Sequence, residues 1–390
     1  MNGWHSTTFL SSVCDIAMGQ APDGSSYNYE GKGFPLIAGA GDFGLLTPKP
    51  HKYTDAPTKL SQEGDIILCV RATIGDRNWA DSRYCLGRGV AGLRAKNDKL
   101  FQNYLWHWLG FIAPALKVKG RGATFLQVSK PDITSLQIPL PPIEEQKRIA
   151  AVLDAADALR AKRREAIAQL DALLQSTFLD MFGDPVTNPK GWDDTHKLGE
   201  LTDIVSGVTK GRRINGQKTR EIAYLAVVNV QDRYLSLKSV KTIEATLDEI
   251  AKYSLRFNDI LLTEGGDPDK LGRGSLWHEE LRECIHQNHI FRVRVSNPEK
   301  LHPVFLNWLI GSIRGKTYFL RSAKQTTGIA SINMTQLRAF PVLIPPFDLQ
   351  RRFASIVEAA ERQKAKMRAH LDELDTLFAS LQSRAFKGEL

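Results

Sequence analysis

The chain has 390 residues, of which 42% are hydrophobic and 24% are charged. This composition excludes a disordered protein, and the length allows about two or three domains with cores of their own. The formal net charge of +9 favours a polyanionic partner, and a nucleic acid is the usual polyanion.

Cysteine usage and hydropathy predict a cytoplasmic protein without a membrane anchor. The four cysteines, Cys14, Cys69, Cys85 and Cys284, are far apart and form no CxxC pair, which is typical of reduced thiols. The N-terminus shows no charged leader followed by an apolar run. The most apolar window, residues 101–116, contains polar residues and a proline and is too short to span a bilayer.

Residues 1–142 have the mixed pattern of an α+β domain. Aliphatic runs at 65–70 and 90–94 predict strands because Gly, Asp and Asn flank them. An apolar helix is expected at 101–111. Ser129 is expected to cap a short helix, since a proline and an aspartate follow it in the first turn.

Residues 143–182 follow a Pro-Pro pair, contain neither Pro nor Gly, and predict one long helix of roughly 60 Å. Its apolar residues recur about every 3.5 residues, which is the period of a coiled-coil seam. The predicted seam includes Ile149, Leu153, Ala156, Leu159, Ile167 and Leu170. An alternative stays open, in which the helix lies on the surface and its apolar stripe faces a globular core.

The stretch 183–191 concentrates Gly, Pro and Asn and predicts a linker between domains. A second α+β part is expected at 192–345, in which Thr335 caps a short helix. Its strands are predicted at 224–230, 259–263 and 290–295, and its apolar helix at 303–313. A second long helix is predicted at 346–388, with seam residues that include Phe353, Ala360, Leu371 and Leu374.

The second half of the chain repeats the first. PPIEEQKRIAAVLDAAD, which starts at Pro141, aligns without a gap with PPFDLQRRFASIVEAAE, which starts at Pro345. Upstream, EGDIIL (63–68) matches FNDILL (257–262) at a different offset, so insertions belong in loops. The chain therefore predicts two tandem copies of a globular part followed by a helix. Because both seams have the same phase, each long helix is the expected partner of the other.

Two patterns suggest catalysis only weakly. GSIRGKT (311–317) has three residues between its glycines, whereas a phosphate-binding loop needs four and a preceding strand. Asp23 with Glu30 and Lys32 could form a nuclease-like metal site, although many loops contain such residues. A nuclease stays an alternative, and the loss of metal-dependent cleavage on Asp23→Ala would support it.

A third pattern concerns a metal. Cys284, His286 and His289 lie within one short segment, but a structural zinc site needs four ligands, and no second pair of ligands follows. Strand alternation predicts that Cys284, His286 and Asn288 share one face, with His289 on the other. We therefore expect no metal and no catalytic residue in this chain.

Basic and polar residues gather in loops of both copies. They occur in KVKGRGAT (117–124), TKGRR (209–213), GGDPDKLGRG (265–274) and AKQTTG (323–328). A single charged cluster is most often a solvated surface. Together these clusters favour DNA binding, because Arg, Lys, Gln and Asn hold phosphates and read base edges.

Several motifs resemble one known family. The PPxxxQxxxA opening of both long helices, NPKGW (188–192), YNYEGKGFPLIAGAGDFG (27–44) and LLTEGGDPDKLGRG (261–274) resemble the specificity subunit of a type I restriction-modification system. The resemblance covers essentially the whole chain. It implies that 1–142 and 192–345 are target recognition domains, each reading half of a bipartite DNA sequence. It also implies that the helices pair as an antiparallel coiled coil with pseudo-two-fold symmetry.

The resemblance further implies a non-enzymatic DNA-recognition subunit. Two modification subunits would dock around the helices and bring S-adenosylmethionine for adenine methylation, and restriction subunits, where present, would bring ATP and Mg. This chain would bind no cofactor itself. The alternative is a stand-alone or architectural DNA-binding protein. The candidate DNA-binding residues are Tyr27, Arg71, Arg77, Arg88, Lys117, Lys119, Arg121, Lys210, Arg212, Arg213, Asp267, Lys270, Arg273, Gln287, Asn288, Lys324 and Gln325.

Overall fold

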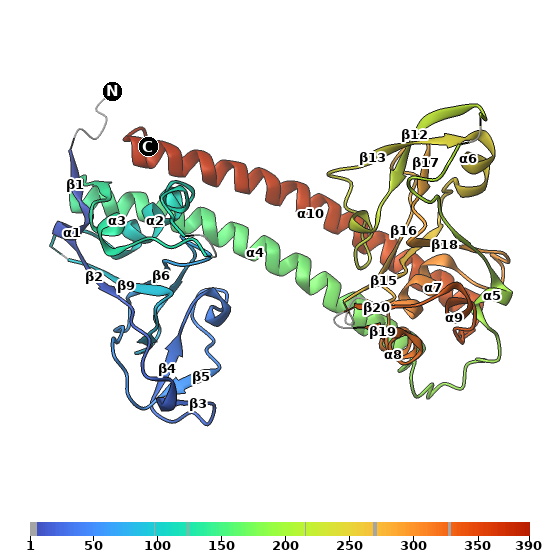
Figure 1. The fold of residues 1–390 in the computed structure, drawn as a ribbon, viewed down its shortest axis with the longest axis horizontal. Helices are drawn as coiled ribbons and strands as arrows, with labels where there is room; N and C mark the ends of the chain where they lie inside the picture. Colours follow the sequence, from blue (N-terminus) through green and yellow to red (C-terminus); the bar gives the residue numbers. More distant parts are fainter. Residues whose placement is uncertain (1–5, 97, 123–124, 215, 268–270, 327–328) are drawn as a thin grey trace. The chain divides into compact units, whose positions relative to one another are not determined.

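A computed structural model describes residues 6–96, 98–122, 125–214, 216–267, 271–326 and 329–390. Internal contacts divide the chain into unit 1, residues 1–165 with 368–390, and unit 2, residues 166–367. Each unit is a mixed α+β structure that contains one globular part and portions of both long helices, α4 and α10 (Figure 1). The predicted fold class is confirmed. Within the described residues no helix is long and apolar enough to cross a membrane.

The main sheet of unit 1 is antiparallel, and its central strands are buried on both faces. Its strand order is β2 (Cys14–Met18), β9 (Val90–Ala95), β6 (Ile66–Cys69) and β7 (Arg77–Trp79). Successive side chains of β6 point to opposite faces. Ile66 and Leu68 therefore join the core beside α2 (Gln102–Val118), whereas Ile67 and Cys69 join a smaller core on the other face. This explains why the run reads as continuously apolar.

The smaller core of unit 1 lies between the main sheet and a second sheet. The second sheet has the order β3 (Tyr27–Asn28), β5 (Lys52–Thr54), β4 (Phe34–Ile37) and β8 (Cys85–Leu86), with β4 and β8 parallel. The remaining elements are β1 (Thr7–Phe9), which pairs with β10 (Gln137–Pro139), helices α1 (Leu10–Val13) and α3 (Lys130–Thr134), and the 3-10 turns η1 (Gly24–Ser26) and η2 (Ala40–Asp42).

Unit 2 repeats both sheets. Its main sheet has the order β11 (Thr202–Ser206), β18 (Ile290–Val295), β14 (Ile260–Thr263) and β16 (Gly274–Leu276). The second sheet has the order β13 (Lys241–Thr246), β12 (Thr219–Leu225) and β17 (Cys284–His286), and β12 and β17 are parallel as β4 and β8 are. On β14, Ile260 and Leu262 face the core beside α7 (Pro303–Ile310), and Leu261 faces the opposite core.

The other elements of unit 2 are short. They are α5 (Leu198–Leu201), η3 (Val227–Asn229), α6 (Leu247–Tyr253), α8 (Ile313–Ser322), α9 (Met334–Arg338), and a small sheet of β15 (Gly265–Gly266), β20 (Ile329–Ser331) and β19 (Lys324–Thr326).

Three local predictions were wrong in unit 2. The strand predicted at 224–230 ends at Leu225, because Asn229 accepts a hydrogen bond from the Ala226 N–H and turns the chain. The helix predicted at 303–313 ends at Ile310, and a separate helix, α8, begins after Ser312. Thr335 is not an N-cap; Asn333 is, and it forms a capping box with Gln336.

The corresponding cap prediction in unit 1 was correct. Ser129 is the N-cap of α3, and its backbone N–H donates to the Asp132 carboxylate at 2.8 Å. The helix predicted at 101–111 is also present, and it extends further, to Val118.

Each long helix has a buried glutamine in its first turn, and the two glutamines make the same contacts. α4 spans Ile143–Phe182 and α10 spans Phe347–Lys387. In unit 1, Gln146 accepts a hydrogen bond from the Phe101 N–H at 2.9 Å and donates to the carbonyls of Lys99 and Pro141. Gln350 makes the corresponding three contacts in unit 2. The glutamine of the repeated PPxxxQ motif thus ties each long helix to the start of the preceding apolar helix.

The apolar stripe was predicted to form a coiled-coil seam or to face a globular core, and each prediction holds in a different part of the helices. In unit 1, Ile149 and Leu153 of α4 are buried in the same core as Phe378 and Phe386 of α10 and as residues of α2. In unit 2, Phe353 at the start of α10 packs edge-on against Phe178 and Phe182 of α4. Farther from the globular cores the seam residues are less buried. Partly buried seam residues are Ala156, Ile167, Leu170, Ala360, Leu371 and Leu374.

Polar residues occupy part of the seam, and one predicted seam residue was wrong. Leu159 is 54% exposed, and the neighbouring Arg160 lies in the seam instead. Its guanidinium is 4.3 Å from the Phe378 ring centroid and binds the Asp375 carboxylate at 2.6 Å. In unit 2, the buried Lys364 donates to Asp171. A polar residue at such a position favours one helix register at a cost in stability.

Candidate nucleic-acid interface

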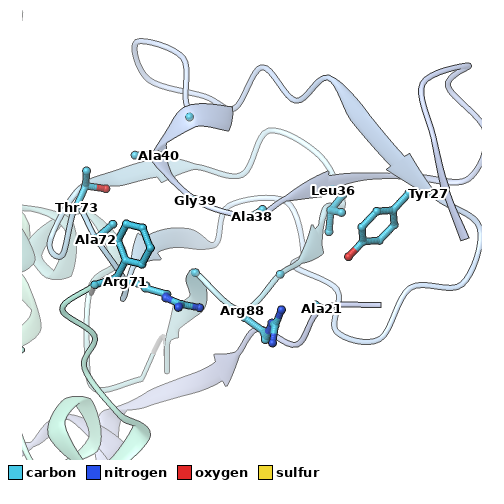
Figure 2. A pocket seen from close by; sticks show the side chains of 14 residues that line it. Ala21, Tyr27, Leu36, Ala38, Gly39, Ala40, Arg71, Ala72, Thr73 and Arg88 are labelled. Carbon is cyan, nitrogen blue, oxygen red and sulfur yellow. The ribbon is translucent and has the colours of Figure 1, made fainter. Parts of the chain in front are cut away.

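A cavity of about 560 Å³ opens in unit 1, beside the second sheet (Figure 2). It is lined by turns at 38–41, 71–73 and 87–89 and by the side chains of Ala21, Tyr27, Leu36 and Phe125. The turn at 87–89 is held by backbone hydrogen bonds at both ends, from Gly87 N–H to Ile37 O at 2.8 Å and from Val70 N–H to Gly89 O at 2.9 Å. Three predicted residues, Tyr27, Arg71 and Arg88, therefore line one cavity.

Glycine is required beside Arg88. A Cβ atom on Gly89 would lie 2.0 Å from the Ala38 carbonyl oxygen, and one on Gly19 would lie 2.1 Å from the Gly87 carbonyl oxygen. No side chain fits at either position, so glycine lets these turns pack closely. The glycine-rich run 38–44 and Gly19, to which Gly207 corresponds in the second half of the chain, are the sequence signals that could have indicated this cavity.

Arg71 and Arg88 supply positive charge to the cavity. The Arg71 guanidinium lies 5.6 Å from the Phe125 ring centroid, which is within cation–π range. Arg88 is exposed, and the structure records no hydrogen bond or ion pair between its guanidinium and any residue it describes. Its donors are therefore available to a ligand such as a phosphate or a base edge.

Other predicted arginines are already used within the protein. Arg77 lies 4.3 Å from the Trp106 ring centroid, and burial lowers its pKa to about 10. Arg212 donates twice to Glu249, and these hydrogen bonds raise the Arg212 pKa. Arg273 donates to Gln231 at 3.1 Å. Arg212 and Arg273 therefore have fewer donors left for DNA, whereas the half-buried Arg77 side chain packs against Trp106 within its own unit.

The remaining basic candidates are on the surface. Lys117 and Lys119 are exposed at the C-terminal end of α2, and Arg121 is exposed and forms a long ion pair of 3.7 Å with Asp132. In unit 2, Lys210 and Arg213 are exposed after β11, Asp267 is exposed after β15, and Lys324 is exposed on β19. Gln325 also lies on β19, whereas Lys270 lies outside the described residues.

The turn at 287–289 of unit 2 carries the polar candidates Gln287 and Asn288. Its backbone is held by hydrogen bonds from Gln287 N–H to Leu225 O and from Glu264 N–H to His289 O, both at 3.0 Å. Both side chains are half-buried, and the structure records no hydrogen bond from either amide to the residues it describes. The His289 ring is held by the Glu264 carboxylate at 2.7 Å.

The predicted alternation applies to Cys284 and His286, which lie two residues apart on β17. It was wrong for Asn288 and His289, because β17 ends at His286 and both residues belong to the turn. The His286 ring lies within hydrogen-bonding distance of the carbonyl oxygens of Tyr253 and Val205, and burial lowers its pKa to about 4. Across the described ranges, no group of three or more potential metal ligands is found.

The nuclease-like residues have local structural roles. Asp23 caps the turn η1, and hydrogen bonds from Ser25 lower the Asp23 pKa. Glu30 and Lys32 form an exposed ion pair with each other.

Comparison with known proteins identifies the family. Residues 1–169 and 189–375 match the type I restriction modification DNA specificity domain. A putative type I restriction enzyme MjaX specificity subunit of Methanocaldococcus jannaschii is 42% identical over 156 residues, which cover 40% of this chain and 37% of that relative. The chain belongs to the family of type I restriction modification DNA specificity domains, and the resemblance predicted from the motifs is confirmed.

More distant relatives match over most of the chain. The type I restriction enzyme EcoBI specificity subunit of Escherichia coli is 24% identical, with 98% of this chain and 85% of the relative covered. The crystal structure of a type I restriction-modification S subunit from M. genitalium covers 99% of this chain and 96% of its own, with a TM-score of 0.56 and 15% identity. At this identity the likeness shows the fold alone.

Proposed function

We propose that this chain is a DNA-sequence specificity subunit that recognises a bipartite target. It would direct adenine methyltransferase subunits, and restriction subunits where the system has them, to that target in the cytoplasm. Each globular part would read one half-site. The observation that carries the proposal is the duplication of one α+β fold, in which each copy presents an unengaged polar side chain on a turn held by backbone hydrogen bonds. Family membership supports the same proposal.

The chemistry would come from the partners. Two modification subunits would carry S-adenosylmethionine, and restriction subunits would supply ATP-dependent and Mg-dependent steps. This chain would contribute binding alone, with base contacts for specificity and phosphate contacts for affinity.

The two long helices would set the distance between the half-sites. Inserting one heptad into each of α4 and α10 keeps the seam in phase and adds about 10 Å of helix, or about three base pairs of B-DNA. We expect the spacer between the half-sites to lengthen while both half-site sequences stay unchanged. Mapping methylated adenines in cells that carry the variant with its partner subunits measures both.

A control insertion of seven Gly and Ser residues in the linker 183–191 leaves both helices unchanged and should leave the spacer unchanged. If the heptad variant still methylates sites that have the parental spacer length, the long helices do not set the distance between the half-sites. The alternative, a stand-alone DNA-binding protein, is distinguished by purification. A chain that binds one sequence tightly and specifically without partner subunits would favour the alternative.

A further inference from the structure

The turns at 87–89 and 287–289 occupy the same position in the two units. Each follows the strand that pairs in parallel within the second sheet, β8 in unit 1 and β17 in unit 2. Each leads into the strand at the centre of the main sheet, β9 or β18.

Backbone hydrogen bonds establish the equivalence residue by residue. The first residue of each turn donates to the end of the parallel strand, as Gly87 N–H to Ile37 O and Gln287 N–H to Leu225 O. The third residue accepts from the residue after the neighbouring strand, as Gly89 O from Val70 N–H and His289 O from Glu264 N–H. Arg88 is therefore the structural counterpart of Asn288, the central residue in each turn.

The central residue of the turn is unengaged in both units. The structure records no hydrogen bond from the Arg88 guanidinium or the Asn288 amide to the residues it describes. Arg71 lacks such a counterpart. It follows Val70, so its equivalent follows Glu264 and is Gly265, which has no side chain. The turn centre is thus a position where both copies present a polar side chain on a backbone fixed at both ends.

The two side chains match two different bases. An arginine forms a bidentate pair with O6 and N7 of guanine in the major groove, and an asparagine forms one with N6 and N7 of adenine. A backbone held on both sides of the residue reduces the conformational entropy lost on binding. We infer that Arg88 and Asn288 are equivalent specificity-determining residues, with Arg88 recognising a guanine in the first half-site and Asn288 an adenine in the second. This inference rests on the proposed function.

The test uses the full complex with its modification subunits and maps the methylated sequences. With Arg88→Asn, we expect methylation of the parental sequence to fall about tenfold to a hundredfold, since a bidentate pair discriminates by about 1–3 kcal/mol. The loss should concentrate at one guanine of the first half-site, where adenine becomes tolerated. The reciprocal Asn288→Arg should affect one adenine of the second half-site and leave the first unchanged.

Two further variants separate base recognition from other effects. Arg88→Lys keeps a donor for guanine and should retain the guanine preference with weaker binding. Lys117→Ala removes an exposed charge and should weaken all sequences alike. If Arg88→Asn or Arg88→Ala weakens every sequence equally, Arg88 is a phosphate contact and the inference is wrong. The inference is also wrong if both half-sites keep every base preference in Arg88→Asn and Asn288→Arg.

If the proposed function itself is wrong, the methylation experiment gives a different result. In that case the parental complex itself methylates no bipartite sequence, whatever residue stands at 88 or 288. A thermal unfolding curve for each variant, superimposable on that of the parent, shows that the changed sequence preference does not come from unfolding.

Discussion

Replacing Gln350 by leucine should destabilise unit 2 strongly, although the two side chains are similar in size. Gln350 is fully buried, accepts a hydrogen bond from the His302 N–H at 2.8 Å, and donates to the carbonyls of Lys300 at 3.1 Å and Pro345 at 2.8 Å. These contacts join the first turn of α10 to the N-terminus of α7. Leucine removes all three and leaves one N–H and two carbonyl groups without these partners.

The magnitude follows from the number of contacts. A typical intramolecular hydrogen bond contributes about 0.5–1.5 kcal/mol, and a buried group left without a partner costs about 1–3 kcal/mol. We therefore expect the free energy of unfolding to fall by about 2–5 kcal/mol. Denaturant titration followed by tryptophan fluorescence and circular dichroism measures this change.

Two other variants make the test specific. Gln363→Leu changes an exposed glutamine on the same helix and should cost less than about 0.5 kcal/mol. Gln146→Leu removes the matching contacts in unit 1 and should cost about as much as Gln350→Leu, because the geometry is the same. The reasoning is refuted if Gln350→Leu unfolds within about 0.5 kcal/mol of the parent.

Leu153→Ala should cost about 2–5 kcal/mol in denaturant titration because Leu153 is fully buried, whereas Leu159→Ala should cost under about 1 kcal/mol; equal losses would contradict the seam assignment. Burial lowers the His286 pKa from 6.5 to about 4, so the unfolded chain binds a proton at a higher pH than the folded chain does. The free energy of unfolding therefore falls as the pH drops from 6.5 to about 4, by at most about 1.4 kcal/mol per pH unit. In titrations at pH 5 and 7, His286→Asn should show a smaller fall than the parent, and an equal fall would refute this. If Lys119 contacts a phosphate, Lys119→Ala should reduce the slope of log affinity against log salt by about 0.9, and an unchanged slope would exclude that contact.

The architecture could be predicted from the sequence because its signals are local or repeated. The absence of Pro and Gly from 143–182 and the 3.5-residue period depend only on neighbouring residues, and the structure has the helix at Ile143–Phe182. The strand runs at 65–70 and 259–263 could be predicted for the same reason. The match between Gln146 and Gln350 in the repeated motif likewise indicates that both residues make the same contact.

Contacts between distant segments could not be predicted in this way. Periodicity places both Leu159 and Arg160 near the seam, and Phe378 and Asp375 on the other helix are the residues that hold Arg160 there. Arg77 and Arg88 were both candidate DNA-binding residues in the sequence. Arg77 instead lies on β7 and against Trp106 of α2, whereas Arg88 lies between two glycines at a cavity.

The sequence by itself thus determined the duplicated architecture, the family and the two long helices. Hydrophobic periodicity, the positions of Pro and Gly, and internal repeats can all be recognised from the order of residues along the chain. Only the tertiary structure decided which polar side chains are engaged within the protein and which are available, because that depends on partners brought together by folding. The equivalence of Arg88 and Asn288 belongs to the second kind. Their segments, GRG and QNH, share no residue, and hydrogen bonds to distant strands alone place them at the same position.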